Sequence, residues 1–130
     1  MTEHLTPEEI HHIHAEVVES DEETEPGTRN PGAVEFATEY IFEGMYGQVP
    51  ETIHQKAAHL LRLIAANHPY VDGNKRTALT AAAALYDLNG YALTPDDGLR
   101  DILKRLATDE SDVNIEEIET YLREHVEPKQ

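Results

Sequence analysis

The chain has no cysteine and no tryptophan, and only ten of its 130 residues are lysine or arginine. Without cysteine, disulfide bonds, thiolate metal sites and cysteine nucleophiles are excluded. A chain of this length buries enough surface to fold without such supports. We therefore expect a single domain over residues 1–130, held together by ordinary hydrophobic packing.

Positive charge is scarce: 10 cations stand against 26 carboxylates, which gives a formal net charge of −16. A polyanion is repelled by nucleic acid and by anionic membranes, so we expect neither as a partner. Any bound anion must be held by a small local group of cations. The dispersed acidity is typical of a protein kept soluble in high salt, and an ordinary acidic cytosolic protein is the alternative.

Long hydrophobic runs are also missing. The longest weakly polar stretch, residues 78–85, is too short to cross a bilayer. The first nine residues lack the basic and apolar regions of a signal peptide. These absences favour a soluble protein of the cytoplasm.

Helical periodicity and capping signals dominate what is present. Thr6, Pro7 and Glu9 form a capping-box pattern, and His14 falls on the apolar side of the helix that follows, where it should be packed or line a cleft. A strand is conceivable only at residues 90–93, so the fold class is all-α. The six predicted helices cover about residues 7–19, 32–42, 50–66, 74–88, 94–107 and 114–126.

The segment HPYVDGNKRT, residues 68–77, lies between the third helix and the fourth, which is apolar nearly all round and therefore central. Pro69 disfavours helical geometry at His68, and Gly73 gives the backbone freedom before the next helix begins. The start of a helix attracts anions, and Lys75 and Arg76 are placed at that start. Phosphate is therefore the anion that we expect to bind at the start of this helix.

The same segment contains the groups that phosphoryl or nucleotidyl transfer requires. The imidazole of His68 can accept a hydroxyl proton, the carboxylate of Asp72 can hold a divalent cation, and the two cations can neutralise transferred charge. The alternative is structural: Asp72 caps the helix, and the others are ordinary residues at helix ends. Two consecutive cations oppose the helix dipole, which favours a bound anion.

Residues 68–79 resemble the signature of the Fic/Doc superfamily, and the form Asn74-Lys75-Arg76 resembles its Doc (death-on-curing) branch. Fic proteins proper have glycine at the position of Lys75 and a further arginine, which is absent at Thr80. The similarity extends over about residues 5–93 and includes the segments 27–32, 56–58 and 89–91. It implies a compact six-helix bundle with a central apolar helix after the motif loop, and it allows a short β flap.

The resemblance also implies a role for each residue of the motif. His68 would be the base that activates the acceptor hydroxyl, and Asp72 would bind Mg²⁺ or orient the base. Gly73 and Asn74 would line the anion hole. Lys75 and Arg76 would hold the phosphates of a nucleoside triphosphate, with ATP as the expected donor.

The activity implied is that of a Doc-like toxin of a type II toxin-antitoxin system. Such toxins transfer the terminal phosphate to a threonine of a translation elongation factor, and a bulky Lys75 would crowd the pose used for AMP transfer. AMP transfer of the Fic type and an idle binding scaffold are the alternatives. Fic proteins often carry an internal inhibitory motif, but Thr38 and Glu43 have one residue too many between them. Restraint would therefore come from a separate, Phd-like antitoxin.

A further prediction concerns residues 44–49, where Gly44 and Gly47 flank Tyr46 between two helices. We expect these three residues to form a mobile flap beside the anion site that positions the acceptor in an extended form by main-chain pairing. A plain surface turn is the alternative.

Overall fold

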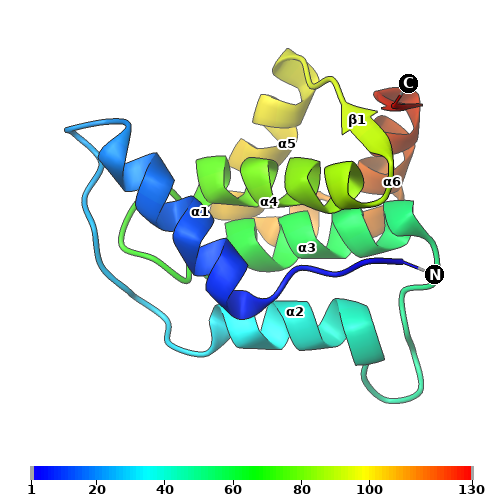
Figure 1. Ribbon diagram of the computed structural model, residues 1–130, viewed down its shortest axis with the longest axis horizontal. Helices are drawn as coiled ribbons and strands as arrows, with labels where there is room; N and C mark the ends of the chain where they lie inside the picture. The colour runs from blue at the N-terminus through cyan, green and yellow to red at the C-terminus, as the bar shows by residue number, and fades with distance from the viewer. Residues whose placement is uncertain (1, 130) are drawn as a thin grey trace.

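The computed structural model describes residues 2–129 and shows six α-helices with one small sheet (Figure 1). The all-α class is confirmed, and a strand is present at the only place where one was expected. A second strand near the C-terminus was not predicted. The elements are α1 (Pro7–Glu19), α2 (Ala33–Glu43), α3 (Ile53–Asn67), α4 (Asn74–Leu88), β1 (Tyr91–Leu93), α5 (Asp97–Thr108), a 3-10 turn η1 (Glu110–Asp112), α6 (Ile115–Glu124) and β2 (Val126–Pro128).

The capping signals explain where the helices begin. The predicted capping box at Thr6 is present, with the Thr6 side chain accepting from the backbone N–H of Glu9. The third helix starts at Ile53, three residues later than the predicted start at Pro50. A second capping box causes this, because the hydroxyl of Thr52 accepts from the N–H of Gln55 and the Gln55 side chain accepts from the N–H of Thr52.

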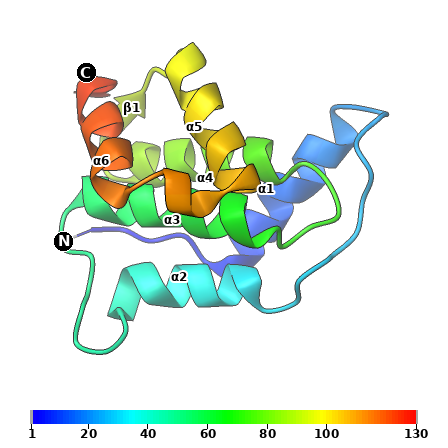
Figure 2. The same cartoon turned by 180° about the vertical axis from the view of Figure 1, so that it is seen from behind.

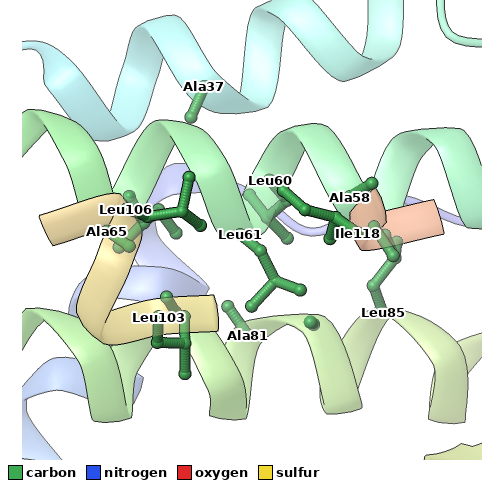
Figure 3. Packing of buried hydrophobic residues seen from close by; sticks show 14 of the residues in the cluster. Ala37, Ala58, Leu60, Leu61, Ala65, Ala81, Leu85, Leu103, Leu106 and Ile118 are labelled. Atoms are coloured by element: carbon green, nitrogen blue, oxygen red, sulfur yellow. The ribbon is translucent and has the colours of Figure 1, made fainter. Parts of the chain in front are cut away.

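The helices α3 and α4 run antiparallel through the centre of the molecule (Figures 1 and 2). The helix α3 contacts α2, α4, α5 and α6, and α4 contacts α1, α3, α5 and β1. Small side chains such as Ala58, Ala65 and Ala81 are buried along this pair and allow close approach, while Leu61 and Leu85 fill the remaining space (Figure 3). The central position predicted for the apolar helix α4 is confirmed.

The C-terminal part closes the molecule on the side opposite α2. Strands β1 and β2 pair antiparallel, with Ala92 opposite Glu127, and hold the end of α6 beside the end of α4. This arrangement places α5 so that its last turn reaches the loop between α3 and α4. Within residues 2–129, no helix combines the length and the hydrophobicity that a membrane span needs.

Candidate functional site

The motif loop joins the end of α3 to the start of α4 at one end of the central pair (Figure 1). His68 ends α3 with φ 47°, in the left-handed region and outside the right-handed helical geometry that Pro69 disfavours for the residue before it. Gly73 has φ 77°, and a Cβ atom there would lie 3.2 Å from Val17 and 3.3 Å from Thr24. Both the backbone angle and the lack of space therefore require glycine at this position.

A pocket of about 290 Å³ opens at this loop and brings together all the motif residues that the sequence singled out. The helix α4 begins at Asn74 after the N-cap residue Gly73, which has no side chain to cap it, and its first internal hydrogen bond runs from the N–H of Thr77 to the carbonyl of Gly73. The preceding N–H groups therefore lack an acceptor within the helix. The pocket is lined by Arg29, His68, Val71, Asp72, Gly73, Asn74, Lys75, Arg76 and Ala107.

His68 is held in one orientation by the end of α5. Its Nε2 lies 3.1 Å from the carbonyl oxygen of Ala107. A carbonyl can only accept, so Nε2 carries the proton and, in the neutral ring, Nδ1 keeps its lone pair. Nδ1 is then the nitrogen that can accept a proton from a hydroxyl in the pocket.

Asp72 is an ionised acceptor with capacity left over. One carboxylate oxygen accepts from the N–H of Gly73 at 2.8 Å and the other from the N–H of Glu25 at 3.2 Å. These hydrogen bonds, the one from Glu25 more than the one from Gly73, hold the pKa of the Asp72 carboxyl below its ordinary range. The alternative in which Asp72 caps α4 is wrong, because Gly73 is the N-cap. Each oxygen retains a lone pair, which fits a Mg²⁺ ion held by one carboxylate together with phosphate oxygens.

Asn74 closes the motif loop on itself. Its side-chain oxygen accepts from the N–H of Tyr70 at 3.0 Å, and its amide donates to the Tyr70 carbonyl at 2.9 Å. These bonds use one side of the side chain to shape the loop. Asn74 still lines the pocket together with Gly73.

The helix α1 anchors the loop through two histidines. The ring of His14 stacks on Tyr70 at 3.6 Å, and its Nε2 donates to the carbonyl of Asp72 at 2.9 Å. His11 is hydrogen-bonded to the Tyr70 hydroxyl at 2.7 Å. Burial raises the pKa of Tyr70 to about 12, so this hydroxyl stays protonated. The prediction that His14 is packed or lines the cleft is confirmed.

The acidic loop before α2 packs against the motif loop as well. The N–H of Val71 donates to the carbonyl of Gly27 at 3.0 Å, and Thr28 forms a β-bridge with Tyr70. Arg76 donates to the hydroxyl of Thr24 and, at 3.3 Å, to the carboxylate of Asp21. Residues 21–28 of the loop between α1 and α2 are therefore attached to the site at several points.

The predicted flap forms, but not beside the pocket. Met45 and Gln48 pair as a β-bridge around a tight turn, and Tyr46 at its tip is 95% exposed. This turn precedes α3 and the motif follows it, so the 15 residues of that helix separate them by about 22 Å. Figures 1 and 2 show the turn and the motif loop at opposite ends of α3. The assignment of Gly44, Tyr46 and Gly47 to an acceptor-positioning flap beside the anion site is wrong.

Sequence reasoning missed the two residues outside the motif that line this pocket, Arg29 and Ala107. Arg29 is the single cation between residues 20 and 31, which was a usable signal. Ala107 contributes a backbone carbonyl, and no side-chain pattern reveals that.

Two comparisons with known proteins agree with the geometry. The model of the Fic/DOC family matches residues 4–86. Over 62 residues, 45% of this chain, the sequence is 44% identical to Toxin Doc of Mycolicibacterium smegmatis and covers 48% of that protein. The match thus spans about half the length of this curated relative. With the family model matching well over half of its residues and the motif residues gathered at one pocket, the chain belongs to the Fic/DOC family.

Proposed function

We propose that this protein is a Doc-like toxin that transfers the terminal phosphate of a nucleoside triphosphate to a hydroxyl of another protein. The observation that carries the proposal is the composition of one pocket. His68 offers a proton acceptor there, the uncapped start of α4 and Lys75 attract phosphate, and Asp72 is an ionised oxygen ligand.

In this reaction, Nδ1 of His68 takes the proton of the acceptor hydroxyl as its oxygen attacks the terminal phosphorus atom. The bond from that phosphorus to the bridging oxygen breaks, and a nucleoside diphosphate leaves. Lys75 and the free N–H groups of α4 stabilise the negative charge on the phosphates. Asp72 would hold Mg²⁺, which when bound neutralises charge on the phosphate oxygens. Arg76 has donors left besides those that bind Asp21 and Thr24.

Terminal transfer is favoured over AMP transfer by the side chain at position 75. A lysine occupies space that glycine would leave open and places a positive charge at the start of α4. The proposed acceptor is a threonine of a translation elongation factor in the cytoplasm, with ATP as donor.

Incubation of the protein and an elongation factor with Mg²⁺ and ATP tests the proposal. Label in the terminal phosphate should appear in the acceptor, whereas label in the α-phosphate should not. Intact-mass measurement of the acceptor distinguishes an added phosphate from an added AMP. Transfer of the α label would establish AMP transfer, and no transfer with retained nucleotide binding would establish an idle scaffold.

This protein has a groove next to the pocket that is a suitable binding surface for the proposed antitoxin. A groove of about 660 Å³ lies between α1, α4 and α5, and its charged lining residues are all cations. In a chain of net charge −16, this concentration of positive charge fits an acidic amphipathic segment. Lys75 and Arg76 line both the groove and the pocket, so a bound segment would also mask the phosphate-binding cations. The groove is lined by Val17, Ser20, Lys75, Arg76, Leu79, Thr80, Arg100, Leu103 and Lys104.

Charge reversal of Arg100 and Lys104 tests this surface without touching the pocket. Expression of the protein should arrest cell growth, and co-expression of its cognate antitoxin should restore it. The variant carrying Arg100→Glu and Lys104→Glu should still arrest growth but should no longer be rescued. Full rescue of this variant would show that the antitoxin binds elsewhere.

A further inference from the structure

Arg29 is a cation of the pocket that the proposed transfer step does not use. It lies in the loop before α2, and it reaches the same pocket as His68 and Lys75. On the basis of the proposed function, we infer that Arg29 binds the terminal phosphate of the nucleotide, the group that is transferred.

The backbone around Arg29 is fixed to the residues next to His68. The N–H groups of Arg29 and Asn30 both donate to the carbonyl of Pro69, at 2.9 Å and 3.1 Å. The side-chain amide of Asn30 donates to the carbonyl of Asn67 at 3.1 Å. The backbone of Arg29 is therefore bonded to Pro69, and the next residue, Asn30, is bonded to both chain neighbours of the proposed base.

The guanidinium of Arg29 also has no carboxylate to neutralise it within residues 2–129. Arg62, Arg76, Arg100, Arg105 and Arg123 each lie within 4.0 Å of a carboxylate oxygen, and Arg29 does not. In a chain with 26 carboxylates, an unpaired arginine that lines a pocket stands out. A planar guanidinium can form two parallel hydrogen bonds to a phosphate.

Lys75 and Arg29 reach the pocket from different elements, and this separates their roles. Lys75 belongs to the first turn of α4, where the N–H groups attract the phosphate chain as a whole. Arg29 is attached beside His68, where the acceptor hydroxyl loses its proton and attacks. The phosphate under attack must lie at the His68 side, so it is the phosphate that Arg29 reaches.

Binding of two nucleotides tests this role without any transfer step. We would measure the affinity of the full chain for ADP and for a non-hydrolysable ATP analogue by calorimetry with Mg²⁺. Arg29→Ala should weaken binding of the ATP analogue by roughly tenfold or more, the usual loss for a hydrogen-bonded charge pair, and leave ADP binding nearly unchanged. Arg29→Lys should restore part of the loss, because the charge remains and the paired geometry does not.

Arg123→Ala is the matched control, since it removes the same charge from an exposed position on α6 and should change neither affinity. An equal loss for both nucleotides, or no loss for either, would overturn the inference, as would a wild-type chain that binds neither nucleotide. The labelled transfer experiment on the wild-type protein leaves Arg29 intact, so failure of the proposed function is seen separately.

Discussion

Replacing His68 with alanine should lower the rate of phosphate transfer by about 10²–10⁴-fold, the usual contribution of a general base. The nucleotide affinity and the thermal stability should stay nearly unchanged. His68 is half-buried, and its imidazole is hydrogen-bonded to the carbonyl of Ala107. Its removal therefore costs the proton acceptor and little packing. Rates are to be measured with label in the terminal phosphate and saturating ATP, beside calorimetric nucleotide binding.

His12→Ala provides the matched control. This histidine is exposed on α1 and pairs with Glu16 one turn later, so its loss should leave the transfer rate unchanged. A His68→Ala variant that transfers phosphate at the parental rate would show that another group takes the proton.

Replacing Lys75 with glycine should lower terminal-phosphate transfer by about 10²-fold, as expected when a charge that stabilises the transition state is removed. The fold-loss in transfer rate should exceed the fold-loss in ATP affinity. The Lys75 side chain both binds phosphate and determines which phosphate faces His68. The opened space should also allow weak AMP transfer. Parallel reactions with label in the terminal or in the α-phosphate measure both. Lys75→Ala removes the same charge but keeps a good helix former. It therefore separates the loss of charge from the helix destabilisation of about 1 kcal/mol that glycine causes relative to alanine.

Arg76→Ala provides the comparison for this prediction. Arg76 holds Asp21 and Thr24 of the acidic loop as well as facing the pocket, so its loss should weaken both kinds of transfer together. If Lys75→Gly and Arg76→Ala behaved alike with both labels, Lys75 would be a general phosphate anchor and would not select the transferred group.

Much of the fold could be predicted from the sequence because its signals are local. A capping box involves residues three apart, so the start of α1 at Pro7 was predicted correctly. The second box, at Thr52 and Gln55, was equally local but was overlooked in favour of Pro50. The motif is similarly local, because seven of the nine consecutive residues 68–76 line one pocket.

The helical class and the motif at the core of the pocket can be predicted from the sequence alone, since both depend on contacts between near neighbours. The residues that surround that core are known only from the tertiary structure. Arg29 comes from a loop about 39 residues before His68, and Ala107 comes from a helix 39 residues after His68. The turn at Tyr46 was placed beside the pocket from its composition, yet the length of α3 holds it at the far end. Such placements depend on how rigid helices pack, and no short stretch of sequence carries that information.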